Sequence, residues 1–197
     1  SPSLNGYTPQ RATALFERAE RELSAIPGVT AVTAAKSPLV AGSTYASSID
    51  VEGVHYDRKF DRTAAFNAVG PGFFTKMGVP LVAGRDIRES DTAAAQKVAV
   101  VSETWVKHFS PNTPPLGRRF RSRGSDTFDT AVVGVVKDTR IAAVREETRP
   151  QFFTPYRQEP DENRTITFYM RSTLPVDQLN SAVRRVMTGL DSDLPIQ

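Results

Sequence analysis

The sequence predicts an α+β fold in two lobes, and three observations carry that prediction. An amphipathic helix followed by a strand opens the chain, and a second amphipathic helix that leads toward a strand closes it. Between them lies a stretch rich in short apolar strands. Because two such units can pair in one layered sheet, we expect residues 1–91 and 161–197 to form an α/β lobe, with residues 92–160 inserted as a β-rich lobe.

The first unit begins at Thr8, whose side chain can cap a helix that carries Pro9 in its first turn. Apolar side chains then recur at three- and four-residue steps, which is the spacing of one buried helix face. They are Ala12, Leu15, Phe16, Ala19, Leu23 and Ile26. Pro27 and Gly28 end the helix, and residues 29–35 are predicted to form a strand.

Two further strands belong to the first segment. Residues 48–54 alternate between apolar and acidic side chains, which indicates a half-buried strand, and residues 62–69 form the next one. After them we expect a break at residues 70–72, a single helical turn at 73–78, an extended stretch at 79–83 and a polar boundary at 84–96.

The middle segment is predicted to be mostly strand. Its strands are expected at residues 97–102, 118–123, 127–136 and 151–156. Ser102 can cap a brief helix that runs through Phe109. Segments of this kind, separated by turns with Pro and Gly, are typical of a β-rich lobe.

The last unit starts with residues 164–171, in which apolar and polar side chains alternate as in a strand. A helix with Pro175 in its first turn follows and ends at Gly189. From Asp193 the chain is predicted to become extended again.

Composition excludes several classes of protein. The chain has 197 residues and a net charge of +3, with 39% hydrophobic and 24% charged residues, as in folded globular proteins. With no cysteine, it has no disulfide framework, Cys-ligated zinc or thiol catalysis. No uncharged stretch approaches the roughly 20 apolar residues of a membrane helix. The first residues are not a signal peptide and include no initiator Met, so we expect a segment of a longer protein.

No catalytic, cofactor-binding or metal-ligating residue is assigned, and the substrate-binding residues stay unknown. The phosphate-loop and nucleophile-elbow motifs are absent. His55 and His108 lie far apart and are interpreted as surface histidines. Three acidic groups are interpreted as parts of solvated loops rather than calcium sites or acid–base pairs. They are Asp86 with Glu89 and Asp91, Glu146 with Glu147, and Asp191 with Asp193.

The run from Arg118 to Arg123 is the most unusual local feature. On a strand, Arg119, Arg121 and Arg123 would share one face, which could contact nucleic acid or anionic lipid. Because the net charge is small and acidic residues follow, we favour an edge strand whose arginines resist aggregation. The large aromatic residues Trp105, Phe73 and Phe74 are expected to fill the core.

Several motifs in one order resemble the MacB-like periplasmic core domain of ABC transporter permeases of the MacB/FtsX type. They are NAVGPGFFTKMGVPLVAGRDI at residues 67–87, VAVVSET at 98–104, PLGRRF at 115–120, VVGVVKD at 132–138 and RPQFFTPY at 149–156. The IPGV junction at 26–29 and the LDSDLPI ending at 190–196 are similar to the first and last units of that family. The resemblance therefore covers nearly the whole chain.

The resemblance implies a non-catalytic, extracytoplasmic domain of a bacterial inner-membrane protein, with a porter-like lobe made from both chain ends. It implies as partners the protein's own transmembrane helices, a second permease copy or half, a separate cytoplasmic ATPase and, optionally, a periplasmic adaptor. Neither a cofactor nor nucleic acid is expected, and the isolated domain is expected to be a monomer. The residues it carries over are structural: Gly72, Gly78, Gly84, Pro71 and Pro80 shape turns, and Arg85 ties a loop by hydrogen bonds.

The expected function is to couple ATP-driven motion in the cytoplasm to export or extraction of a substrate outside the membrane. The alternative is an extracytoplasmic sensor module that binds a small ligand and belongs to a signalling protein. A sensor requires a defined pocket, so the shape of the surface discriminates between the two hypotheses.

Overall fold

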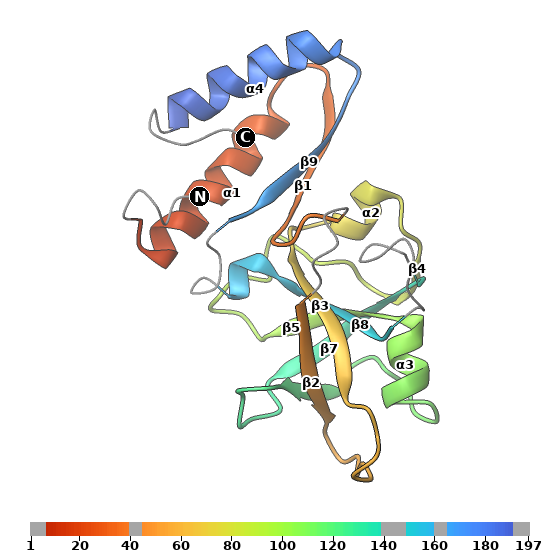
Figure 1. Ribbon diagram of the computed structural model, residues 1–197. Coiled ribbons are helices and arrows are strands. Elements are labelled where there is room, and N and C mark those ends of the chain that lie inside the picture. Colours follow the sequence, from red (N-terminus) through yellow and green to blue (C-terminus); the bar gives the residue numbers. More distant parts are fainter. Residues whose placement is uncertain (1–6, 40–44, 139–148, 160–164, 191–197) are drawn as a thin grey trace.

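The computed structural model describes residues 7–39, 45–138, 149–159 and 165–190 (Figure 1). Runs of one to three strands separate the helices along the chain. In order they are α1 (Pro9–Ser24), β1 (Val29–Ala35), β2 (Tyr45–Val51), β3 (Thr63–Val69), α2 (Phe73–Met77), β4 (Leu81–Gly84), β5 (Val98–Ser102), α3 (Glu103–Phe109), β6 (Arg119–Ser122), β7 (Thr130–Val136), β8 (Gln151–Pro155), the 3₁₀ turn η2 (Tyr156–Gln158), β9 (Thr167–Ser172) and α4 (Val176–Leu190).

The elements nearest the two ends of the sequence lie together in what we call the α/β unit: α1, β1, β9 and α4 (Figure 1). Thr8 caps α1 by accepting a hydrogen bond from the Arg11 amide. β1 and β9 pair antiparallel, with Val29 opposite Ser172 at one end and Ala35 opposite Thr167 at the other. The two helices pack against each other and cover this strand pair, so Leu23, Val32 and Val183 meet in a small core.

Six other strands close into a barrel. Their order is β2, β6, β7, β5, β8, β3, and the ring closes because β2 also pairs with β3. Side chains from all six strands fill the interior. They include Ile49, Ala64, Val101, Phe120, Val132 and Phe152. Trp105 and Phe109 of α3 complete this core, and Ser102 caps that helix by accepting a hydrogen bond from the Trp105 amide.

A second apolar layer lies outside the barrel. Phe73 and Phe74 of α2 are fully buried there and pack with Val100 and Phe153. β4 pairs with β7 and forms an extra strand beside the ring. The barrel wall is therefore covered by apolar side chains on both faces in this region.

The α/β unit meets the barrel where β1 approaches β3. The two strands share one register pair, Ala35 opposite Val69, flanked by hydrogen bonds of 2.8 Å on either side. The Asn67 side chain extends the contact by exchanging two hydrogen bonds with the Ser37 backbone. We call this narrow strand contact the junction.

The α+β fold class predicted from sequence is confirmed. Residues 29–35 form a strand as predicted, and each of the other predicted elements within the described residues appears with ends shifted by a few positions. The strand predicted from Asp193 lies outside the described residues. The lobe boundaries at residues 91 and 160 stay a prediction. β2 and β3, which the sequence assigns to the α/β lobe, pair with β6 and β8 of the predicted insertion.

Candidate functional site

A charged cluster lies where α1 meets η2 and the loop after β4; we call it the junction cluster. It comprises Glu17, Glu20, Lys76, Glu89, Tyr156 and Arg157. The Arg157 guanidinium stands at its centre and forms ion pairs with Glu17 at 3.4 Å, with Glu20 at 3.2 Å and with Glu89. One cation therefore ties α1 to η2 and to the loop, beside the junction.

Burial governs the electrostatics of this cluster. Glu20 is 4% exposed, and its Oε2 accepts hydrogen bonds from the Tyr156 hydroxyl at 3.1 Å and from Arg157 Nη2 at 3.2 Å. Burial raises the pKa of Glu20, although the charges of Arg157 and Lys76 act in the opposite direction. Burial and the nearby Glu20 carboxylate also raise the pKa of Tyr156, so the phenol stays protonated and donates.

The prediction that the acidic group at residues 86–91 lies in a solvated loop holds for Glu89, whose side chain is 71% exposed, and is wrong for Asp91. Asp91 is buried and accepts two hydrogen bonds from Arg85 at 2.8 and 2.9 Å. Asp86 accepts hydrogen bonds from the amide and hydroxyl of Thr75, both at 2.9 Å. Glu89 belongs to the junction cluster. These carboxylates fasten the loop, and the predicted role of Arg85 in tying it is confirmed.

The other acidic groups, Glu146 with Glu147 and Asp191 with Asp193, lie outside the described residues. Within the parts of the chain that the structure describes, no three His, Asp or Glu side chains come together in a way that could hold a metal ion. His55 is exposed. His108 stacks on Phe60, and its Nε2 lies 2.6 Å from the Asp61 carbonyl oxygen, so it has a packing contact at the end of α3.

The arginine run does not form an edge strand, and that prediction is wrong. β6 pairs with β2 on one side and with β7 on the other. Arg121 pairs with Asp50 on β2 at 3.3 Å and lies over the Phe128 ring, whereas Phe120 points into the barrel. Arg118 donates to the Glu52 carbonyl. The run therefore lies within the barrel wall, and part of its charge is neutralised locally.

The expectations for aromatic residues and turn glycines are confirmed. Trp105, Phe73 and Phe74 are fully buried. Gly72, Gly78 and Gly84 all have positive φ angles, and Gly84 leaves the least space for a side chain. A Cβ there would lie 2.2 Å from the Val133 carbonyl oxygen, so only glycine fits beside β7.

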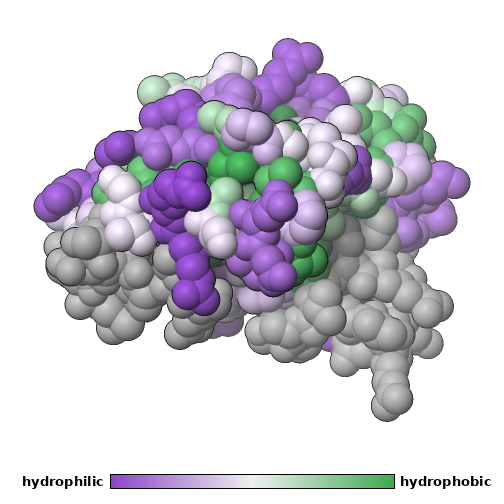
Figure 2. Space-filling view, turned by 90° about the horizontal axis from the view of Figure 1, so that it is seen from above, coloured by the Kyte–Doolittle hydropathy of each residue, from purple (hydrophilic) through white to green (hydrophobic). Residues whose placement is uncertain are grey.

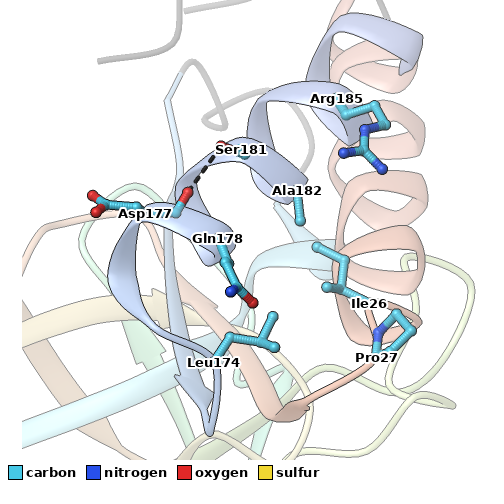
Figure 3. Close-up of a pocket in the computed structure, with 8 residues that line it drawn as sticks. All are labelled: Ile26, Pro27, Leu174, Asp177, Gln178, Ser181, Ala182 and Arg185. Carbon is cyan, nitrogen blue, oxygen red and sulfur yellow. Dashed lines mark hydrogen bonds between the residues drawn. The ribbon is translucent and has the colours of Figure 1, made fainter.

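The described surface is hollowed between the end of α1 and the start of α4. This groove has a volume of about 460 Å³ and an apolar floor of Ile26, Leu174 and Ala182, with Asp177 and Arg185 on its rim (Figure 3). It is open to solvent. An open groove of this kind gives less burial than the enclosed pocket that a small-molecule sensor needs.

Seen from above, the surface is mixed, with small apolar areas between hydrophilic side chains (Figure 2). The exposed large apolar residues come from separate elements and include Val176 of α4, Tyr45 of β2, and Leu81 and Val82 of β4. None of the helices in the described ranges has both the length and the apolar character needed to cross a bilayer.

The sequence did not indicate the junction cluster. The only local signal is a charged residue, Arg157, directly after the apolar strand at residues 151–156. Its partner Glu20 lies 137 positions earlier and reads in sequence as an ordinary polar residue of an amphipathic helix.

The described residues therefore form a two-part α+β domain. In it, charged side chains connect the α/β unit to the closed barrel. The sequence profile of the MacB-like periplasmic core domain matches residues 3–186. The chain belongs to this family, and the resemblance noted from its motifs is confirmed. No curated protein matches the chain.

Solved structures share the fold. The periplasmic region of MacB from Actinobacillus actinomycetemcomitans superimposes with a TM-score of 0.60 at 18% identity, covering 87% of this chain and 72% of that one. The extracellular domain of the noncanonic ABC-type transporter YknZ from Gram-positive bacteria gives a TM-score of 0.57 at 16% identity, covering 88% and 82%. The chain is thus a periplasmic domain of the MacB-like ABC transporter permease family.

Proposed function

We propose that this domain couples ATP-driven motion of its transporter to the movement of a substrate outside the membrane, without catalysing a reaction itself. The proposal is based on the region where the two parts meet, at the junction and the junction cluster. The α/β unit contacts the barrel through the β1–β3 register pair, through the junction cluster and through an apolar cluster in which Phe16 and Ala34 pack against Ala68 and Tyr156. Motion delivered to α1 would therefore reach the barrel through this contact region.

Membership in the family implies a membrane permease that works with an ATPase. We propose as partners of this chain its own transmembrane helices, a second permease copy or half, and a separate cytoplasmic ATPase, with a periplasmic adaptor as an optional further partner. The charged residues support a non-catalytic role. Glu20, Asp86, Asp91 and Arg157 all serve contacts within the domain.

Hydrogen exchange of the whole transporter tests the proposal without knowledge of the substrate. The purified permease with its ATPase is compared in a nucleotide-free state and with a non-hydrolysable ATP analogue. We expect exchange rates to change in peptides that cover β1, β3 and η2. An ATPase variant that cannot bind nucleotide is the control and should show no change. Unchanged exchange throughout this domain, alongside altered exchange in the ATPase, would contradict coupling.

A further inference from the structure

Helix α4 is the least covered of the helices in the described ranges. None of its residues is buried, whereas α1 buries six. The open groove with Ile26 and Leu174 on its floor runs beside it, and Val176 in its first turn is 70% exposed. Within the described residues, α4 therefore has one side packed on α1 and a long side that faces solvent beside an apolar floor.

The polar residues of α4 that border the groove are arranged in a line. Asp177, Ser181 and Arg185 follow one another at four-residue steps, so they lie along one side of the helix, with Ser181 midway (Figure 3). All three are exposed. Eight residues at a rise of 1.5 Å place the acid and the base about 12 Å apart along the axis. Within the described parts of the chain, neither charge has an ion-pair partner. Ser181 donates its hydroxyl to the Asp177 carbonyl oxygen at 2.9 Å.

This line of residues is complementary to itself. If two α4 helices lie antiparallel with Ser181 facing Ser181, Asp177 of each copy faces Arg185 of the other, and two ion pairs form. Gln178 then faces Arg184 of the other copy, so none of these positions brings like charges together. Parallel helices in the same register would instead oppose acid to acid and base to base. Opposite charges at equal distances from a midpoint therefore fit a second copy, as in the isologous contact of a two-fold dimer.

We propose that α4 and the groove beside it form the surface on which two copies of this domain meet, with their α4 helices antiparallel about Ser181. The aliphatic part of each Arg185 side chain covers the apolar floor of the partner's groove. The inference rests on the second permease copy proposed above, but not on coupling to ATP. Because the surface is small and partly polar, the contact forms where the membrane part of the transporter holds two copies at high local concentration.

Cysteine cross-linking of the whole permease in its membrane tests the proposal. Ser181→Cys places the cysteine on the two-fold axis, where it meets the same residue of the second copy. Asn180→Cys is the matched control, because this neighbour is also exposed but projects 100° away around the helix. The unsubstituted permease is the baseline for cysteines elsewhere in the protein. We expect oxidation to join two copies through Ser181→Cys and not through Asn180→Cys. Equal cross-linking of the two variants, or none, would overturn the proposal.

Charge reversal tests the orientation of the two helices. In the Ser181→Cys permease, Asp177→Arg or Arg185→Asp alone should lower the cross-linking yield several-fold, because like charges then face each other. The two reversals together should restore the yield, because opposite charges face each other again. Single reversals without effect, or a double reversal that does not restore the yield, would rule out the antiparallel contact.

The cross-linking result and the hydrogen-exchange result are independent. Missing cross-links alongside a nucleotide-dependent exchange change would overturn this surface and leave coupling standing. Specific cross-links without an exchange change would support the surface and contradict coupling.

Discussion

Arg157 Nη2 lies 3.2 Å from Oε2 of Glu20, although 137 positions separate the two residues in sequence. Both side chains are more than nine-tenths buried. The contact connects α1, near the start of the chain, to η2, which follows the last strand of the barrel. It stands where the two parts of the molecule meet.

Arg157→Met should destabilise the domain strongly. The substitution leaves Glu20 buried without its main cation, and breaking a buried ion pair from one side costs about 3–5 kcal/mol. Arg121→Met is the matched control, because the Arg121–Asp50 pair is partly exposed and a surface pair contributes under about 1 kcal/mol. Urea unfolding of both variants measures the difference. Equal losses would show that Arg157 is no more important than a surface arginine.

The stability of the domain should depend on pH through the protonation of Glu20. Its pKa is raised in the folded state, so the folded chain binds this proton more tightly than the unfolded chain. The contribution of Glu20 to stability is therefore fully present below its unfolded pKa and is lost as the pH rises through the folded pKa. Across that window the wild type should lose stability relative to Glu20→Gln, as measured by unfolding at a series of pH values. A difference between the two proteins that stays constant with pH would refute the shift.

Gly84→Ala should be far more damaging than Gly78→Ala. Both glycines have a φ of 73°, and a left-handed conformation costs an alanine about 1–2 kcal/mol. At Gly78 nothing lies within 4 Å of an added Cβ, whereas at Gly84 the Val133 carbonyl oxygen lies 2.2 Å away. The excess loss of unfolding free energy in Gly84→Ala measures the close approach of β4 to β7. Equal losses would mean that strain alone determines the effect.

A disulfide across the junction should restrict motion between the two parts. Ala35 and Val69 form a pair without mutual hydrogen bonds, for which the Cα separation is about 4.5 Å, within the range of a disulfide. These 197 residues contain no cysteine of their own. In the whole transporter, oxidised Ala35→Cys/Val69→Cys should lose the nucleotide-dependent exchange change in the barrel, and reduction should restore it. Single Ala35→Cys is the control. A change that persists after oxidation would argue against motion at this contact.

Local structure was predictable because its causes lie close together in sequence. The α1 stripe from Ala12 to Leu23 and the Ser102 cap of α3 both depend on residues a few positions apart. The same holds for Arg85 and Asp91, although the burial of that pair was missed. The family motifs then indicated the fold in which these elements are arranged.

Barrel closure and the junction cluster depend on distant residues, and no local pattern indicates them. Arg121 looks like part of an exposed basic run until β2 places Asp50, 71 positions earlier, beside it. The carboxylate partners that the structure shows for Arg157 likewise lie far away in sequence, the nearest of them, Glu89, 68 positions earlier. A single sequence gives the chemistry of such residues but not their neighbours, so the predicted edge strand was wrong and the predicted solvated loop was wrong for Asp91.

The register of β1 and β9 has a mechanical consequence. α1 runs into β1 at Val29, and β9 runs into α4 at Ser172, and these two residues are opposite each other at one end of the ladder. A pulling force applied through the two helices would act on this end first and open the ladder like a zipper, pair by pair toward Ala35. Zipper opening needs far less force than sliding two strands past each other, so the α/β unit would yield while the closed barrel stayed intact.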